Sequence, residues 1–542
     1  MAKQSPAVAI VFVMLLAIAL PVATVLSFVG ADTQGLWAHL ARTVLDRYVV
    51  NTLILVAGVA SFAALAGVGA AWLVTTYEFP LRRLLEFALV LPLAMPAYIL
   101  AYAYTDLLQV TGPVQGALRD ATGWTVRDYW FPEVRSLGGA IFVLSAALYP
   151  YVYLIARAAF LEQSTSAVEV SRTLGLSRLG AFLRIAAPMA RPAIVAGTML
   201  VAMETLADFG AVKYFDLEVF TTGIYRAWFA YGNPAAAAQL ASLLLVAVFA
   251  VVLAEQASRG ARRYAQPGAA SREIRPWRLG GVRGAIATTI CALPVLFGFA
   301  LPAAVLVQMS LAVTEEASAT RMASLAANTT MLAVIAATLA VALAAAVSYA
   351  SGRTTSVARQ LARFAYLGYA TPGVIAGVGL LIVAGGFDAW LRAGGGVQGL
   401  LLSGSLVVLV YAYLVRFFAV AHGPIDAAYM KLGNRYAEAA RTLGHKPATV
   451  FRRIDAPLMR GTALAAAALV FVDVMKELPA TMILRPFNFD TLATEAFQLA
   501  TTERLDQAAL PSLAIAAAGL IPVVLLCLGM RRARPGSIEV QP

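Results

Sequence analysis

Charged residues are scarce in this chain. Asp, Glu, Lys and Arg make up only 13% of its 542 residues, whereas a soluble protein carries about 25%. Hydrophobic residues make up 61%, and the mean hydropathy is +0.77. The apolar residues come in runs of about 18 or more, which is typical of membrane-spanning helices. The shortage of charge therefore excludes an ordinary soluble globular protein.

Cysteine and histidine are also rare. The two cysteines, Cys291 and Cys527, both lie in apolar runs, which argues against a disulfide or a thiolate metal site. The three histidines, His39, His422 and His445, are scattered, with no pair at ligand spacing and no nucleophile nearby. With no catalytic constellation in view, we do not expect an enzyme.

A phosphate-binding loop is missing as well. No Gly-Lys-Ser or Gly-Lys-Thr occurs, and none of the five lysines follows a glycine. Such a loop is what cradles the phosphates of ATP in its commonest binding motif. We therefore expect this chain to bind no cofactor, so that any ATP-Mg must be hydrolysed by a separate chain.

What the sequence does contain is a series of long apolar segments, which predicts an all-α membrane protein. The N-terminal run exceeds the apolar core of a signal peptide and no clear cleavage site follows it, so we interpret it as an uncleaved span. We predict twelve transmembrane helices, at about 7–29, 50–74, 84–106, 138–158, 191–212, 234–255, 284–308, 327–350, 364–385, 399–420, 460–478 and 509–530.

Basic residues set the orientation. With both termini in the cytoplasm, most lysines and arginines fall in cytoplasmic segments. The loops 107–137 and 309–326 are then periplasmic, and the segment 256–283 is a basic cytoplasmic linker. The basic residues are spread over many loops, so they indicate anchoring to anionic lipid of the bilayer, with no nucleic-acid partner. The linker carries Arg259, Arg262, Arg263, Arg272, Arg275, Arg278 and Arg283.

One polar loop occurs twice. The stretch 169–191 is repeated at 438–460 without a gap. The identical pairs are Glu169/Glu438, Arg172/Arg441, Thr173/Thr442, Leu174/Leu443, Gly175/Gly444, Phe182/Phe451, Arg184/Arg453, Ile185/Ile454, Ala187/Ala456, Pro188/Pro457 and Arg191/Arg460. A long-period repeat indicates a duplicated architecture.

The duplication divides the chain into two six-helix halves. The first, 1–255, contains the loop 159–190, and the second, 284–542, contains the loop 421–459. Asn51-Thr52-Leu53 parallels Asn328-Thr329-Thr330, and Pro96 parallels Pro372. Six spans is an even number, so the halves insert in parallel. A pseudo-two-fold along the membrane normal, with a shared cavity, is the expected result.

Each loop copy is predicted to form a helix that ends at a left-handed glycine, Gly175 or Gly444, followed by a second short helix over 177–184 or 446–453. Pro447 suits the first turn of that helix, and Pro188 and Pro457 mark the return to the membrane. The short helix would expose an apolar face to a groove on a partner. Its apolar residues are Leu179, Phe182, Val450 and Phe451. The alternative is a duplicated surface loop without a partner.

Acidic residues occur at equivalent places in the fifth and eleventh spans. Glu204 and Asp208 stand four apart, which predicts one helix face, and Asp473 and Glu477 repeat the pair. A carboxylate in hydrocarbon is costly, so these four are candidates for the substrate path. The alternative is structural pairing with Lys213, Arg226 or Lys476 nearby in the sequence.

Two tyrosines, Tyr214 and Tyr225, follow the first acidic pair. Phenol and carboxylate oxygens both suit a hard cation, so the tyrosines are further candidates for the substrate path. Tyrosines near a membrane interface also serve as anchors, and this alternative stays open.

The repeated loop resembles the EAA motif of ATP-binding cassette importer permeases, with Glu438-Ala439-Ala440 intact and Glu169-Val170-Ser171 departing from it. The stretches ETLADFG (204–210), FTTGIY (220–225), KELPAT (476–481) and RPFNFDTL (485–492) resemble the ferric-iron, Fbp-type permeases. This resemblance covers both halves, and fused thiamine permeases are similar in layout.

The resemblance implies a type I importer permease in the bacterial inner membrane that moves ferric iron. A periplasmic substrate-binding protein would dock outside, and a homodimeric ATPase would dock at the two loops. The implied coupling residues are Glu169, Gly175, Phe182, Ile185, Pro188, Glu438, Gly444, Phe451, Ile454 and Pro457. Transient contact with Fe³⁺ would fall to Glu204, Asp208, Asp473 and Glu477.

Other substrates and one other class of protein remain as alternatives. Thiamine, a polyamine or an oxyanion such as phosphonate or sulfate would suit the same architecture. Lys476 speaks against a bare iron site and favours iron carried with an anion. An ion-coupled secondary transporter is the alternative class, but it has no use for two docking loops.

Overall fold

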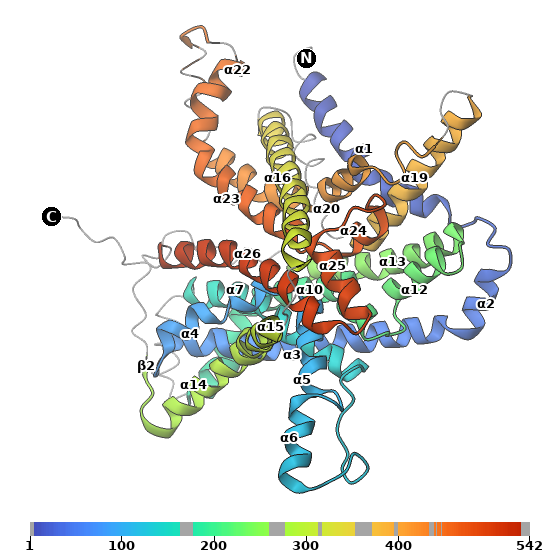
Figure 1. Cartoon of the computed structure of the whole chain (residues 1–542). Helices are drawn as coiled ribbons and strands as arrows, with labels where there is room; N and C mark the ends of the chain where they lie inside the picture. The colour runs from blue at the N-terminus through green and yellow to red at the C-terminus, as the bar shows by residue number, and fades with distance from the viewer. Residues whose placement is uncertain are drawn as a thin grey trace. The chain divides into compact units, whose positions relative to one another are not determined.

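The structure is a computed structural model that describes residues 5–162, 177–259, 277–312, 317–352, 371–394, 399–432, 438, 440, 442–445 and 447–532. These residues are α-helical apart from short connections and one pair of two-residue strands (Figure 1). Ten of the described helices are long and apolar enough to cross a membrane. A bent pair of helices adds an eleventh span, and a shorter apolar helix, Val11–Ser27, corresponds to the first predicted span, at 7–29. The predicted fold class is therefore confirmed.

The described chain forms two compact units. Unit 1 comprises residues 1–43, 223–245 and 315–498, and unit 2 comprises 44–222, 246–314 and 499–542. The helices of unit 1 are α1 (Ser5–Ser27), α2 (Leu36–Thr43), α16 (Ala317–Gly352), α19 (Gly373–Ala393), α20 (Leu406–Leu432), α22 (Pro447–Val450), η4 (Phe451–Asp455), α23 (Ala456–Met475) and α24 (Pro479–Leu484). Most of α12 (Phe220–Phe229) and α25 (Leu492–Thr501) and the first part of α13 (Pro234–Arg259) also belong to it.

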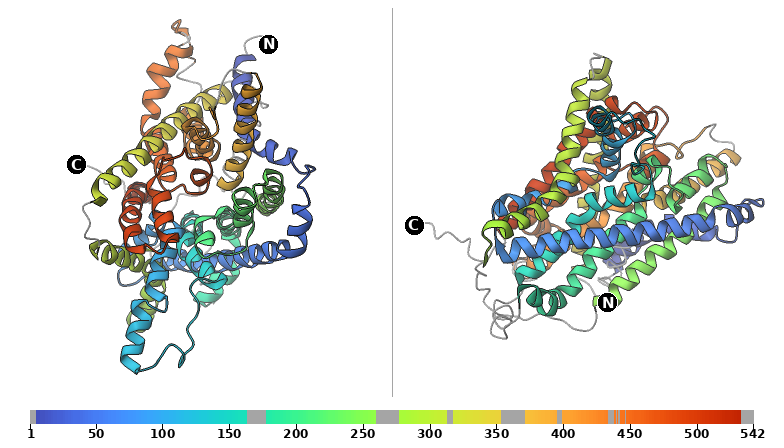
Figure 2. Two further views of the ribbon diagram at one scale, coloured as in Figure 1. Left: turned by 45° about the vertical axis from the view of Figure 1, so that its right-hand side comes forward. Right: turned by 90° about the horizontal axis from the view of Figure 1, so that it is seen from below.

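Unit 2 also consists mainly of α-helices. Its long helix α3 runs unbroken through 32 residues (Figure 2). Its elements are α3 (Leu45–Thr76), β1 (Tyr77–Glu78), α4 (Arg82–Ala88), η1 (Leu91–Ala94), α5 (Ala97–Leu108), α6 (Pro113–Thr122), α7 (Leu137–Glu162), α9 (Arg178–Ala181), η2 (Phe182–Ala186), α10 (Ala187–Ala207), α11 (Gly210–Tyr214), β2 (Trp277–Arg278), α14 (Gly281–Val295), η3 (Leu296–Ala300), α15 (Leu301–Ala312) and α26 (Leu505–Arg532).

The two compact units differ from the two sequence halves, because each half contributes its first span to the other unit. The first half also contributes most of α12 and the first part of α13 to unit 1, and the second half contributes α26 to unit 2. In unit 1, α1 lies against α19, where a Cβ on Gly379 would come within 2.3 Å of the Pro21 carbonyl oxygen. The Tyr411 hydroxyl of α20 donates to the Ala17 carbonyl at 2.5 Å. In unit 2, the Tyr104 hydroxyl of α5 donates to the carbonyl of Phe297, in the span that opens the second half, at 2.6 Å.

The end of the basic linker is held by a short parallel strand pair in unit 2. Strand β2 pairs with β1 in the register Tyr77 with Trp277 and Glu78 with Arg278. The rings of Tyr77 and Trp277 pack edge to face at 5.8 Å. This pairing ties the entry to α14 to the end of α3, which explains how a span of the second half is retained in unit 2.

The predicted span 84–106 is not one helix. Helices α4–η1 and α5–α6 meet at an angle of 95° at Pro96. Proline has no N–H and pushes the preceding residue to an extended conformation, which Met95 adopts. Pro96 and Pro372 each precede a helix and offer their carbonyls to its first turn, at 3.0 Å from Ile99 N and 2.9 Å from Ile375 N. The parallel between the two prolines is therefore structural.

Other predicted boundaries are shifted. The spans predicted at 364–385 and 399–420 are observed at 373–393 and 406–432, since hydropathy alone does not register the helix start that Pro372 imposes. Residues 353–370 lie outside the described part. The predicted loop 309–326 is shorter than expected, because α15 continues to Ala312 and α16 begins at Ala317.

The repeated Asn-Thr pair makes equivalent hydrogen bonds in both units. Asn51 donates to the carbonyl of Glu218 at 3.0 Å, and Thr52 accepts the Phe220 N–H at 3.4 Å. Asn328 and Thr329 do the same for the segment 490–492, at 3.0 and 2.9 Å. Each pair thus fixes the segment that precedes α12 or α25 to the start of a long span, which explains why the sequence repeats it.

Candidate functional site

The second copy of the repeated loop turns at Gly444, as predicted. Its φ is +80°, a left-handed conformation that costs other residues strain. The His445 N–H donates to the Ala440 carbonyl at 3.1 Å, a bond that spans the turn and closes a Schellman-type helix end. The next helix begins at Pro447, the position predicted for it. The equivalent Glu169 and Gly175 lie outside the described residues.

The short helix does not end at residue 453. In both copies it passes through one π-helical turn, η2 or η4, and continues as the fifth or eleventh span. Pro188 and Pro457 lie in the first turn of α10 and α23, directly after the π turns, where each lacks the N–H that a continuous helix would use. The loop helix and the span therefore form one continuous helical rod in each unit.

Equivalent aromatic clusters lie at the two π turns. In unit 2, Phe182 packs against Trp72 of α3 at 5.1 Å and against Phe160 of α7 at 6.3 Å. In unit 1, Phe451 packs against Tyr349 of α16 at 5.1 Å, and Tyr349 packs against Tyr429 of α20 at 6.3 Å. Each phenylalanine thus packs within its own unit with its side chain half-buried, and its contact with a partner stays a prediction.

The buried face of the second loop includes further residues expected to be exposed. Val450 is buried with Ala440, and Ile454 packs against them. Ile185 is likewise half-buried, and the side chain of Leu179 lies outside the described ones. The outward face carries instead Leu183, Arg184, Glu438, Leu443, Arg452 and Arg453, all exposed. Val450 therefore differs from its predicted exposure, because the loop helix continues into the membrane span and packs against its own unit.

Both acidic pairs lie at a break in the span. Helix α10 ends at Ala207 and α23 at Met475, so Asp208 and Glu477 are outside the helices and do not share a helical face with Glu204 and Asp473. Asp208 accepts the Val212 N–H at 3.1 Å, in the first turn of α11. This carboxylate satisfies an N–H that a new helix leaves without an internal partner.

Glu477 does the same in unit 1 and is more heavily bonded. It accepts the N–H groups of Ala480 and Thr481 at 2.9 and 3.0 Å, and the Thr481 hydroxyl at 2.6 Å. Arg416 of α20 pairs with it at 3.0 Å, and only 1% of the Glu477 side chain is exposed. A Cβ on Gly373 would lie 2.4 Å from the Arg416 guanidinium, so this ion pair requires glycine at the start of α19.

The other two carboxylates are half-buried. Asp473 pairs with Lys476 at 2.8 Å, as the structural alternative predicted. Lys213 instead pairs with Asp216, at 3.5 Å. Glu204 lies on α10 in unit 2. In the residues that the structure describes, no three acidic, histidine or cysteine side chains gather where they could hold a metal ion.

The two candidate tyrosines have different surroundings. Tyr214 is buried against Tyr102 at 4.7 Å and accepts a hydrogen bond from Arg135 at 3.2 Å. Burial raises the pKa of Tyr214, and the nearby Arg135 charge offsets this only partly. Burial also raises the pKa of Tyr225, which packs on Phe229 at 4.6 Å. Both phenols stay protonated at neutral pH, so they offer hydroxyl groups and not phenolates.

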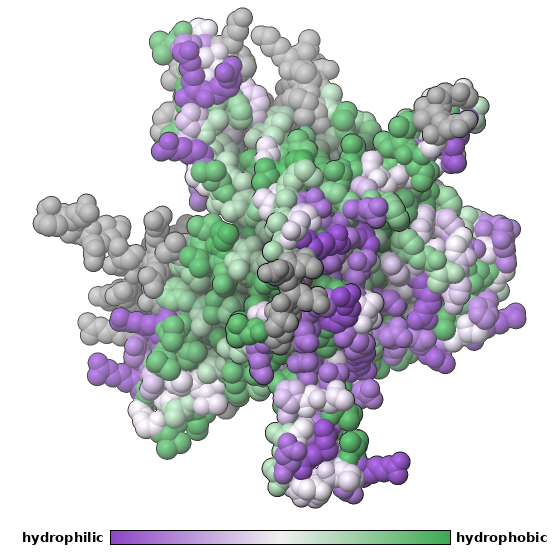
Figure 3. Space-filling view, viewed as in Figure 1, coloured by the Kyte–Doolittle hydropathy of each residue, from purple (hydrophilic) through white to green (hydrophobic). Residues whose placement is uncertain are grey.

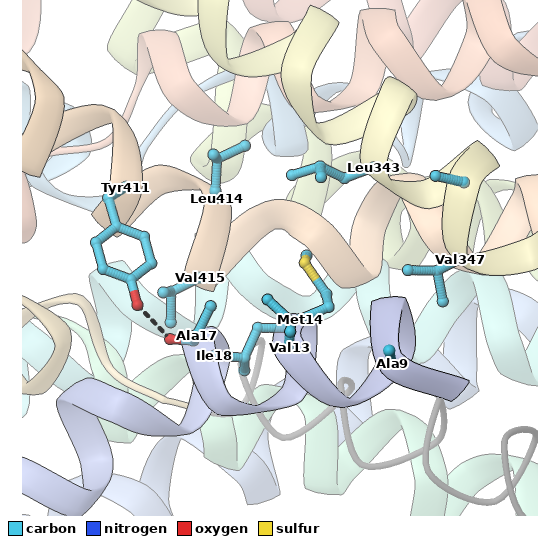
Figure 4. A pocket seen from close by; sticks show the side chains of 11 residues that line it. Ala9, Val13, Met14, Ala17, Ile18, Leu343, Val347, Tyr411, Leu414 and Val415 are labelled. Carbon is cyan, nitrogen blue, oxygen red and sulfur yellow. Dashed lines mark hydrogen bonds between the residues drawn. The ribbon is translucent and has the colours of Figure 1, made fainter. Parts of the chain in front are cut away.

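Two cavities differ sharply in character. The first, of about 490 Å³, lies between α1, α16 and α20 in unit 1, and Figure 4 shows its aliphatic lining, with the Tyr411 hydroxyl bonded to Ala17. An ion would lose its hydration there without replacement, so this cavity is not a path for iron or an oxyanion. The second, of about 540 Å³, lies in unit 2 beside the segment 109–135 and is lined by polar and aromatic residues.

Sequence reasoning missed the arginines at these places. Arg135 and Arg416 lie far from the acidic motifs in the sequence, so spacing gave no signal for them. A charged residue inside the apolar run 399–420 was the available hint for Arg416. Arg157 and Glu86 form another buried ion pair, within unit 2. Both residues lie inside predicted spans, and the sequence did not indicate that they pair.

Comparisons with known proteins agree with this architecture. A family model described as the binding-protein-dependent transport system inner membrane component matches residues 63–263. The Fe(3+)-transport system permease protein FbpB 2 of Haemophilus influenzae is 24% identical over 481 residues, 88% of each chain. The sulfate transport system permease protein CysT of Salmonella typhimurium is 30% identical over 225 residues, 40% of this chain and 78% of the relative. The molybdenum transport system permease protein ModB of Escherichia coli is 26% identical over 206 residues, 37% and 87% of the two chains.

The relatives are transport permeases, and the described helices supply the spans that such a protein needs. Figure 3 shows hydrophobic residues over much of the helical surface, as lipid-facing helices require. The chain therefore belongs to the family of binding-protein-dependent transport system inner membrane components, as a multi-pass permease subunit of an ABC importer.

Proposed function

We propose that this chain is the permease of a ferric-iron importer. The observation that carries the proposal is the extent of the likeness to the Fe(3+)-transport permease, which runs through 88% of both chains and so includes both halves. The sulfate and molybdenum relatives match only 40% and 37% of this chain. The fused arrangement is thus shared with the iron transporter.

In this proposal a periplasmic substrate-binding protein delivers the substrate, and a homodimer of separate ATPase chains drives the transport. The ATPases dock on the two loops, and in the second copy they contact the exposed residues Glu438, Leu443 and Gly444. Glu169 and Gly175 are the matching positions of the first copy in the sequence. Closure of the ATPases displaces the two continuous rods and alternates access to the path. ATP-Mg binds on the ATPases alone.

The substrate path in this proposal uses the polar breaks of the fifth and eleventh spans. Asp208 is the best candidate contact, since it interacts electrostatically with Tyr102, whose ring packs against Tyr214 at 4.7 Å. Glu477 is a weaker candidate than its position in the sequence suggested, because Arg416 already neutralises it. Fe³⁺ here is cargo, and the path needs only transient contacts.

The test is reconstitution of the chain with its ATPase and binding protein in proteoliposomes. We expect ATP-dependent accumulation of radiolabelled iron. Accumulation of sulfate or molybdate in place of iron would contradict the proposal and favour the oxyanion alternative. Two observations support that alternative: the 30% identity to the sulfate permease and the presence of Arg135 at the polar cavity.

The orientation is part of the same proposal, with both termini and the linker 256–283 in the cytoplasm. A cysteine introduced at position 270 should resist an impermeant thiol reagent added outside, whereas one at Arg127, in the segment after α6, should react. The reverse pattern would contradict the orientation.

A further inference from the structure

The polar cavity of unit 2 is built around one arginine. Arg135 lines it, with 34% of its side chain exposed, and pairs with Glu503 at 2.8 Å. Glu503 is itself 59% exposed at the beginning of the α26 segment. Burial lowers the pKa of Arg135, but its bonds to Glu503 and Tyr214 outweigh this, so the guanidinium remains charged.

The cavity wall is held in place by its own hydrogen bonds. Gln115 donates to the Leu108 carbonyl at 2.8 Å and accepts from the Tyr129 hydroxyl at 2.8 Å. Arg119 donates to Tyr129 at 3.1 Å and to the Val110 carbonyl at 2.9 Å. A wall tied at four points keeps its shape without a ligand, which lowers the ordering cost of binding one.

Tyr214 fixes the orientation of the Arg135 guanidinium. Its Nη2 donates to the Tyr214 hydroxyl at 3.2 Å, and its carbon lies 4.9 Å from the centre of the Tyr214 ring. Beneath Tyr214 is Tyr102, whose buried hydroxyl has no hydrogen-bond partner among the described residues.

From this geometry we infer that the cavity binds a carboxylate or oxyanion group of the incoming substrate at Arg135. Without substrate the Glu503 carboxylate pairs with Arg135, and the substrate anion replaces it. Exposed ion pairs contribute little to stability, so a ligand anion can replace Glu503 at a small cost in free energy. The volume of about 540 Å³ suits a small chelate. Glu133 also lines the cavity but is exposed, so water screens it from the guanidinium.

This inference rests on the proposed function and specifies its substrate: iron enters as an anionic ferric chelate, recognised by its ligand and not as a bare cation. The described residues agree, since they offer an arginine here and no cluster of metal ligands. Aromatic residues of the cavity, Tyr129, Trp130 and Phe131, provide flat walls for the organic part of such a chelate.

The experiment measures binding of ferric citrate, citrate and sulfate to the purified full chain in nanodiscs by calorimetry. Arg135→Gln should weaken binding of ferric citrate about tenfold or more, because it removes a charge-assisted bond. Glu503→Gln should strengthen it several-fold, roughly two- to fivefold, because it removes the competing carboxylate. Tyr214→Phe, which only loosens the orientation of Arg135, should weaken binding about two- to fivefold.

Arg47→Gln is the matched control, since Arg47 forms an exposed ion pair with Glu218 in the same unit and does not line the cavity. It should change binding less than about twofold. If Arg135→Gln fails to fold, the gain in Glu503→Gln decides the question. Unchanged binding in both variants, or weaker binding in Glu503→Gln, would overturn the inference.

The three probes separate the possible sources of the anion. Tighter binding of ferric citrate than of citrate or sulfate supports the chelate, and preference for a free anion overturns it. Iron uptake by the unaltered transporter tests the proposed function independently. A transporter that accumulates iron while Arg135→Gln binds ferric citrate normally would refute the anion site and leave the proposed function standing.

Discussion

The breaks at Asp208 and Glu477 carry out the same backbone task in two different electrostatic settings. Each carboxylate accepts an N–H of the helix that restarts after it, from Val212 in one unit and from Thr481 in the other. Glu477 also faces Arg416, whereas alanine, Ala147, stands at the equivalent position of the first half. Duplication therefore preserved the capping geometry, which the backbone requires, while the charges around it diverged.

Because the charges diverged, the two carboxylates are expected to differ in role. A fully neutralised and buried carboxylate is a structural element, because every oxygen already has donors. Asp208 instead interacts with the buried Tyr102, in the unit that holds the polar cavity. The two breaks should accordingly respond differently to mutation.

The largest effect is expected at Glu477. Replacing it with alanine leaves the Arg416 guanidinium partly buried and unpaired, which should destabilise the protein by about 3–5 kcal/mol. The lowered thermal unfolding midpoint of the purified protein measures this loss. The double change Arg416→Met with Glu477→Met should restore much of it. A single variant as stable as the original would show that the pair does not hold unit 1 together.

Next in size is Gly444. Gly444→Val forces a β-branched residue to a φ of +80°, which should cost roughly 1–3 kcal/mol locally. The displaced loop should lower substrate-stimulated ATPase activity about fivefold or more while membrane insertion persists. Gly461→Ala in α23 is the matched control, since nothing lies within 4 Å of the added methyl group. Full stimulation in Gly444→Val would separate the turn from ATPase coupling.

A smaller stability effect, with a larger functional one, is expected at Asp208. Asp208→Asn weakens a helix cap, a change of about 1 kcal/mol in the free energy of unfolding. If Asp208 contacts the substrate, iron uptake in proteoliposomes should still fall about tenfold. Normal uptake would remove Asp208 from the path. Removing all four carboxylates together is a poorer test, because the loss of Glu477 would destabilise unit 1.

The smallest effect is expected at the Asp473–Lys476 pair. Both side chains are about a quarter exposed, so Lys476→Gln should change the free energy of unfolding by about 0.2–1 kcal/mol. The unfolding midpoint of this variant, compared with that of Glu477→Ala, ranks the two pairs of unit 1 directly. An equal loss in the two variants would show that burial does not distinguish them.

Sequence reasoning predicted the long-range organisation well and the local orientation less well. The turn at Gly444, the helix start at Pro447 and the equivalence of Pro96 with Pro372 all follow from single residues whose backbone limits are absolute. The orientation of Phe451 depends on Tyr349, which lies about a hundred residues away and has no signature in the loop itself.

The carboxylate pairs show the same limit. Their four-residue spacing indicated one helix face, yet the spans end between the two members of each pair. Pro479 gave a signal for the break in unit 1, since proline favours the first position of a helix and so indicates that a new helix starts there. Nothing in the motif indicated Arg416, because it comes from another span.

The sequence by itself determined the helical membrane class, the duplication and the glycine turn, because hydropathy, repetition and backbone limits act over short stretches or by simple periodicity. Tertiary structure alone decided which compact unit the first span of each half joins and which carboxylate is neutralised. It also decided that Arg135 meets Glu503 and Tyr214 at one cavity. These outcomes depend on residues hundreds of positions apart in the chain, whose meeting is set by packing and not by spacing.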